Sequence, residues 1–161
     1  MIKDTLTKDL TVAMKHKETL RVSIIRMMLA EIVRKEKEKG ISIDDETTVK
    51  VLYGMIKKGE EAAAQFEAAG RKDAAEKERA EVEIIKSYLP RQLSVDEIRG
   101  EALKVIAETG VRDLKGVGKV MGVLSKRLSG KAAGNEMSKV VREELEKLQS
   151  IEQEKGLPLM L

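Results

Sequence analysis

The stretch Tyr88-Leu-Pro-Arg-Gln-Leu-Ser-Val-Asp-Glu97 divides this chain of 161 residues into two parts. Pro90 disfavours helix at the residue before it, and Ser94 followed by Glu97 has the pattern of a capping box, which begins a new helix. One helix therefore ends here and another starts, and we place a domain boundary near Arg91. The predicted units are residues 1–91 and 92–149, followed by a tail of residues 150–161.

The composition predicts that both units are helical. Aromatic residues are almost absent, with two Tyr and one Phe, whereas 37% of the residues are charged and only two are proline. The dominant residues, such as Ala, Leu, Lys and Glu, favour helices over twisted sheets. We expect an all-α protein, with a domain of about four helices followed by a small three-helix bundle.

In the N-terminal unit, apolar residues recur three and four positions apart, which indicates amphipathic helices. Gly40 is expected to close the second helix, and Asp44 to cap the third. The third helix should end near Gly70, and the fourth should span residues 72 to 89.

The C-terminal unit has the pattern of three shorter helices, with Gly110 closing the first and Asp113 capping the second. They are predicted at residues 95–108, 114–128 and 135 to about 149. The apolar tail that follows has no helical partner in the sequence, so it is expected to be frayed or docked on another chain.

Several classes of protein are excluded or disfavoured. The chain has no cysteine, so it has no disulfide framework, no thiolate nucleophile and no Cys-ligated zinc. The sole histidine, His16, is expected on the surface of the first helix, and we predict no metal or cofactor. Since neither a signal segment nor an apolar run of membrane-spanning length is found, we expect a soluble, cytoplasmic protein.

Charge is concentrated between Arg112 and Arg142. This segment has eight basic and two acidic residues, a balance of +6, whereas the rest of the chain carries −3. Such segregation suggests a polyanionic partner, with nucleic acid as the first candidate, but charge alone fits an ordinary solvated face equally well. The candidate contacts are Lys115, Gly116, Gly118, Lys119, Gly122, Lys126, Arg127, Lys131, Lys139 and Arg142.

The spacing of these residues supports a binding surface. Lys115, Lys119 and Lys126 lie four and seven positions apart, which places them along one side of a helix. Gly116 and Gly118 open that helix, so its N–H groups could meet a phosphate without obstruction by side chains. The basic segment lacks aromatic side chains on which bases stack, so recognition of the backbone and shape of a folded RNA is favoured.

No pattern of catalytic residues accompanies the basic segment. The spacing of Gly116, Gly118 and Gly122 imitates a dinucleotide-binding loop, but no strand precedes it. Neighbouring acids such as Glu60 and Glu61 do not converge on a helix, and Ser125-Lys126 alone does not make an amidase. We therefore interpret the chain as a binding protein rather than an enzyme.

Four stretches resemble the YqeY family. They are Arg71-Lys-Asp-Ala-Ala-Glu-Lys-Glu78, Glu83-Ile-Ile-Lys-Ser-Tyr-Leu-Pro-Arg-Gln-Leu93, and Gly118-Lys-Val-Met-Gly122 with Lys139-Val-Val-Arg-Glu-Glu-Leu145. The resemblance covers residues 1 to 148. It implies a C-terminal domain similar to the tail of the B subunit of tRNA-dependent amidotransferase, which grips the outer corner of tRNA. It therefore makes tRNA the expected partner.

Two alternatives stay open. The chain could be an adaptor for another protein, with its charged second helix or its apolar tail as the contact. It could also be an accessory factor in glutamine-dependent tRNA amidation, a carbon–nitrogen ligase reaction. The sequence does not settle the oligomeric state.

Overall fold

The computed structural model describes the backbone of residues 1–159 and the side chains of residues 1–155. Within this range the chain forms seven α-helices and one short 3-10 helix and contains no strand, which confirms the predicted all-α class. The chain divides into two compact units, Met1–Leu89 and Pro90–Leu161. No helix among the described residues has the length and apolar character needed to cross a membrane.

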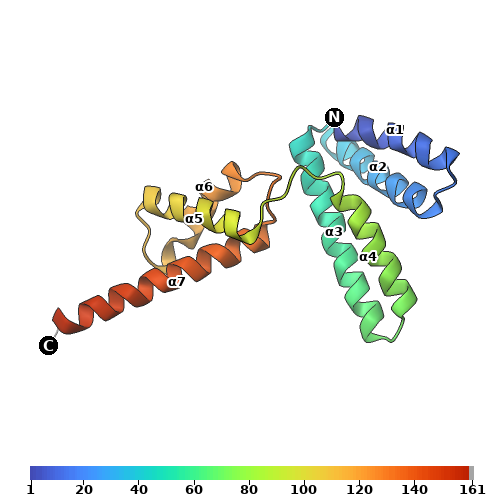
Figure 1. Ribbon diagram of the computed structural model, residues 1–161. Coiled ribbons are helices and arrows are strands. Elements are labelled where there is room, and N and C mark those ends of the chain that lie inside the picture. The colour runs from blue at the N-terminus through green and yellow to red at the C-terminus, as the bar shows by residue number, and fades with distance from the viewer. Residues whose placement is uncertain (160–161) are drawn as a thin grey trace. The chain divides into compact units, whose positions relative to one another are not determined.

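The N-terminal unit consists of two helical hairpins. Figure 1 shows α1 beside α2 and α3 beside α4. Their bounds are α1 Ile2–Lys15, α2 Thr19–Lys39, α3 Asp45–Ala68 and α4 Lys72–Lys86. The apolar face of α1 contributes Leu6 and Ala13 to a core that also buries Ile25, Met28 and Leu52.

The ends of these helices follow local chemistry. Gly40 has φ 71°, a left-handed conformation that favours glycine, and it closes α2 as predicted. Asp44 caps α3 by accepting a hydrogen bond of 2.8 Å from the Thr47 N–H. The fourth helix ends at Lys86 rather than Leu89, and Ser87 to Leu89 form a turn. The reason is Pro90, which keeps the residue before it out of the helical conformation.

The C-terminal unit is a bundle of three helices, α5 Val95–Thr109, α6 Val117–Arg127 and α7 Gly134–Leu159 (Figure 1). Ser94 begins α5 by accepting a hydrogen bond of 3.1 Å from the Glu97 N–H, as the capping box predicts. Fully buried side chains from the three helices, including Val105, Leu124 and Leu145, form a core separate from that of the N-terminal unit.

Two helices of this unit differ from the prediction. The second is split, because Leu114–Gly116 forms a 3-10 helix, η1, before α6 begins. The third does not stop near Gln149, since α7 continues to Leu159. It also starts at Gly134, so Asn135 lies inside the helix, where its Oδ1 accepts from the Glu136 N–H at 3.0 Å. The predicted frayed or docked tail falls largely on residues whose side chains are not described.

The stretch that separates the units is fastened at both ends. The Tyr88 hydroxyl donates a hydrogen bond of 2.5 Å to Asp9 in the N-terminal unit. On the other side, the Gln92 amide donates to the Gly130 carbonyl at 2.9 Å, and the Leu93 N–H donates to the Lys131 carbonyl at 2.8 Å. The first residue of the motif Tyr-Leu-Pro-Arg-Gln-Leu is thus hydrogen-bonded to the N-terminal unit, and its last two residues are hydrogen-bonded to the C-terminal unit.

Candidate nucleic-acid interface

The basic segment occupies η1, α6, the loop after it and the first turns of α7. Nine of the ten predicted contact residues are exposed, and only Gly116 is half-buried. We use the name α6 face for the surface formed by Lys115, Gly118, Lys119, Gly122 and Lys126.

The α6 face is set by the packing of its helix. Val120 and Leu124 are fully buried in the core, so the opposite side of α6 faces the solvent. Lys119 and Lys126 lie on that side, two turns apart, and Gly122 lies between them. The three residues thus form one exposed stripe, as the spacing predicts.

Gly118 and Gly122 leave the backbone of this stripe bare. A Cβ added at either position would have no heavy atom within 4 Å beyond its immediate chain neighbours and the backbone of its own helix. A large ligand can therefore approach the helix between the lysines without meeting a side chain. This is the surface form that a phosphate backbone needs for close contact.

Gly116 has a different role from the one expected. A Cβ at this position would lie 2.0 Å from Cγ1 of Val111, so the glycine permits close packing within the unit. The nearby N–H groups are also occupied. That of Leu114 donates to the Gln149 side chain at 3.2 Å, and that of Lys115 donates to Asp113 at 3.1 Å. These hydrogen bonds occupy N–H groups of η1, the short helix that precedes α6.

Arg127 is committed to a neighbouring helix. Its guanidinium pairs with both carboxylate oxygens of Glu108 on α5, and this hydrogen bonding lowers the pKa of Glu108. By contrast, Lys115, Lys119 and Lys126 take part in none of the ion pairs between described residues. These lysines are therefore not paired with acids, whereas Arg127 has a structural partner.

Two acids near Lys139 and Arg142 on α7, Glu143 and Glu144, form ion pairs with α5. Arg99 of α5 binds Glu144 at 2.5 Å and Glu143 at 2.9 Å. Burial acts to raise the pKa of Glu144, but hydrogen bonds from Arg99 and Lys147 outweigh it and hold this pKa below its usual value. The pKa of Glu143 is lowered chiefly by its hydrogen bond from Arg99, and the charge of Lys139 adds to a smaller extent.

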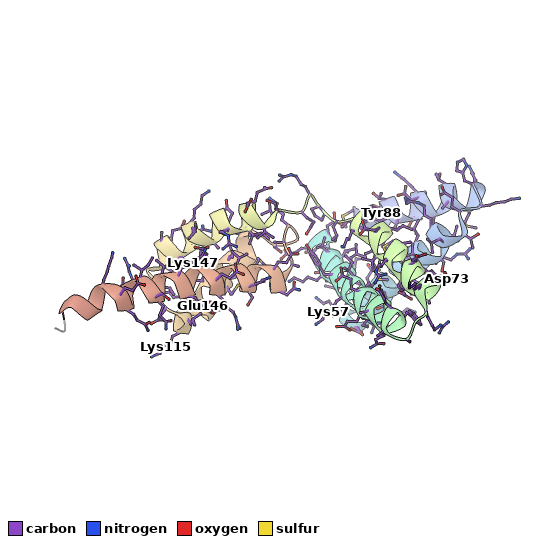
Figure 2. All side chains as sticks on the ribbon, turned by 60° about the horizontal axis from the view of Figure 1, so that its bottom comes forward. Lys57, Asp73, Tyr88, Lys115, Glu146 and Lys147 are labelled. Atoms are coloured by element: carbon purple, nitrogen blue, oxygen red, sulfur yellow. The ribbon has the colours of Figure 1, made fainter. Side chains whose placement is uncertain are left out.

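Figure 2 shows Lys115 extending from the bundle and the pair Glu146 and Lys147 along α7. Lys147 also binds Glu144, at 3.1 Å, which adds to the neutralisation of that acid. Lys139 and Arg142 stay exposed on the same helix.

The described residues carry no other recognisable chemistry at this surface. Among them no three His, Asp or Glu side chains gather closely enough to hold a metal ion. His16 is exposed at the end of α1, where it was expected. Residues 90–161 contain no Phe, Tyr or Trp, so this unit cannot stack bases on aromatic rings.

Curated relatives come from fungi. The chain is 29% identical over 140 residues to "Altered inheritance of mitochondria protein 41, mitochondrial" of Pyrenophora tritici-repentis, which covers 86% of this chain and 77% of the relative. Proteins of the same name in Candida glabrata and Lachancea thermotolerans are 32% and 38% identical over 114 and 85 residues. These matches cover 69% and 52% of this chain, and 60% and 46% of the relatives.

These names contradict the cytoplasmic location predicted from the sequence, because they assign the relatives to mitochondria. That prediction depended on the absence of a signal segment and of an apolar run of membrane-spanning length, and such absences do not determine a compartment. In the structure, the apolar face of α1 packs into the core of the N-terminal unit through Leu6 and Ala13.

The sequence model of the YqeY family, described as "Yqey-like protein", matches residues 3–145. The match spans both units and includes all ten predicted contact residues, from Lys115 to Arg142. This chain therefore belongs to the YqeY family.

Proposed function

We propose that this protein binds structured RNA, most plausibly tRNA, through the α6 face of its C-terminal unit. The observation that supports this proposal most directly is the group of Lys115, Lys119 and Lys126, which are exposed around bare glycine backbone and used in no ion pair between described residues. Lysines in such an array attract a phosphate backbone and release its counterions.

The class of nucleic acid follows from what the surface offers. Lysine side chains contact phosphates, whereas reading of single-stranded bases requires aromatic or planar platforms. Since residues 90–161 contain no aromatic side chain, the proposal is recognition of backbone and shape. The resemblance of the C-terminal unit to a tRNA-gripping tail favours tRNA over duplex DNA.

The experiment is a salt titration of the full-length protein against fluorescently labelled tRNA, read by anisotropy. If four phosphates are neutralised, the logarithm of the affinity falls with the logarithm of salt with a slope of about −3 to −4. Duplex DNA and unstructured RNA serve as competitors. Preference for tRNA over both supports the proposal, whereas absence of binding at low salt overturns it.

A charge-reversal pair locates the surface. K119E/K126E is expected to weaken tRNA binding about tenfold or more, because two attractive contacts become repulsive. The matched control is K8E/K15E on α1, which reverses two exposed lysines at the same seven-residue spacing. Equal affinities of the two variants would show that the α6 face is not the RNA contact.

A further inference from the structure

The N-terminal unit carries a second basic surface, which sequence reasoning missed. It is a groove of about 380 Å³ between α2 and α3, and we use the name α2–α3 groove for it. Its lining includes five basic side chains and one carboxylate. The basic residues are Arg34, Lys35 and Lys39 from α2 and Lys50 and Lys58 from α3, and the acid is Glu31.

Only part of this charge is compensated within the protein. Arg34 binds Glu31 at 2.7 Å and Glu38 at 3.0 Å, and Lys35 lies 3.7 Å from Glu38. The ion pairs between described residues do not include Lys39, Lys50 or Lys58. Three ammonium groups are therefore available to a ligand in the groove.

The two walls of the groove act on one another electrostatically. The pKa of Glu31 on α2 is lowered, chiefly by its hydrogen bond from Arg34 and to a smaller extent by the charge of Lys58 on α3. Lys58 thus lies close enough to the opposite wall for one ligand to contact both helices.

The α3 wall is open between its lysines. Gly54 lies four residues from both Lys50 and Lys58, and a Cβ added there would have no heavy atom within 4 Å beyond its chain neighbours and its own helix backbone. The two lysines are about 12 Å apart along the helix axis. Like the α6 face, this surface therefore combines lysines on one side of a helix with bare backbone between them. Figure 2 labels Lys57, the residue directly before Lys58, and so helps to locate this part of α3.

The side chains that line the groove favour a polyanion over a protein. Its apolar lining is limited to Val51, Met55 and the stems of the basic residues, and no aromatic ring lines it. Binding energy in protein interfaces is concentrated in buried Trp, Tyr and Arg side chains that fill pockets. Exposed cations around an open backbone instead match the requirements of phosphate contact.

We propose that the α2–α3 groove is a second RNA-binding site, which holds the sugar–phosphate backbone of a structured RNA of the class that we propose for the α6 face. This inference rests on the proposed function. The groove contributes affinity and salt dependence, since phosphate contacts carry no information on base sequence.

The test compares six full-length proteins in the same tRNA titration. They are the wild type, K50E/K58E, K50Q/K58Q, K119E/K126E, the combination of the two charge-reversal pairs, and the control K8E/K15E. We expect K50E/K58E to bind tRNA about tenfold or more weakly, with a salt slope smaller by about 1.4 to 1.8, because two phosphate contacts are lost. Circular dichroism establishes that each variant is folded, and K50Q/K58Q removes the charges without adding repulsion.

The outcomes separate this inference from the proposed function. If K119E/K126E weakens binding while K50E/K58E and K50Q/K58Q bind like the control, the groove is not an RNA site and only this inference is overturned. An acidic protein then becomes its expected occupant. If the wild-type protein fails to bind tRNA, both proposals are overturned. Weaker binding by K50E/K58E and by K119E/K126E, with a further loss when they are combined, supports two RNA-binding surfaces.

Discussion

At the scale of single residues, Gly116 has the least free space of the glycines in the basic segment. An added Cβ would lie 2.0 Å from Val111 Cγ1, so we expect G116A to destabilise the C-terminal unit by about 1–3 kcal/mol through overpacking. G118A is the matched control in open space, and it should be neutral or stabilise α6 by up to about 1 kcal/mol. Urea unfolding followed by circular dichroism measures both. Equal losses of stability in G116A and G118A would contradict a packing role for Gly116.

Glu81 of α4 is a second informative residue, because burial, reinforced by the charge of Glu78, raises its pKa. A carboxyl whose pKa is raised in the folded state binds more protons in that state than in the unfolded one. The free energy of unfolding therefore falls as the pH rises from the pKa of the unfolded chain through the raised pKa of the folded chain. We expect E81Q to raise the Tm at about pH 7.5, with a smaller gain near the ordinary Glu value of 4.5. Thermal melts at the two pH values test this, and no gain at the higher pH would contradict it.

At the scale of elements, Arg99 fastens α5 to α7 through Glu143 and Glu144. We expect R99M, which keeps an apolar stem, to lower the Tm of the C-terminal unit at neutral pH. The pKa values of both acids are lowered in the fold, so their stabilisation is present above the unfolded value of 4.5 and is lost as pH falls through the folded values. The Tm difference between R99M and wild type should therefore shrink in acid. A constant difference would exclude this ion-pair cluster as its cause.

The helices were predictable where the signal is local. Gly40, Asp44 and Ser94 end or begin helices through their own backbone conformation or side chain, so short sequence patterns suffice. The split between η1 and α6 was not predictable, because η1 contacts a distant part of the chain: the Leu114 N–H donates to Gln149 of α7, thirty-five residues away. The length of α7 was missed because its last turns lack the regular apolar spacing on which the prediction relied.

At the scale of the whole molecule, the two units have separate hydrophobic cores. Leu52 and Leu124 are both fully buried, one in each core, and truncation of either to Ala should cost about 2–5 kcal/mol. We expect differential scanning calorimetry to resolve two transitions, with L52A lowering one and L124A lowering the other. A single transition that both substitutions lower equally would contradict independent cores.

The candidate sites show how far sequence reasoning extends. The exposure of Lys119 and Lys126 followed from helical spacing, whereas the pairing of Arg127 with Glu108, nineteen residues away, did not. The α2–α3 groove was missed because its cations come from two helices, at positions 34–39 and 50–58, and only tertiary packing brings these stretches to one groove. RNA binding by either surface stays a prediction.

The bare backbone of α6 has a consequence for local motion. Two glycines in this helix, Gly118 and Gly122, cost about 2 kcal/mol of intrinsic helix stability relative to alanine, so α6 depends on the burial of Val120 and Leu124 to stay folded. Its amide hydrogens should therefore exchange with solvent sooner than those in the first turns of α7. A polyanion bound across the lysines would hold this helix closed, so slowed amide exchange confined to α6 would report occupancy directly.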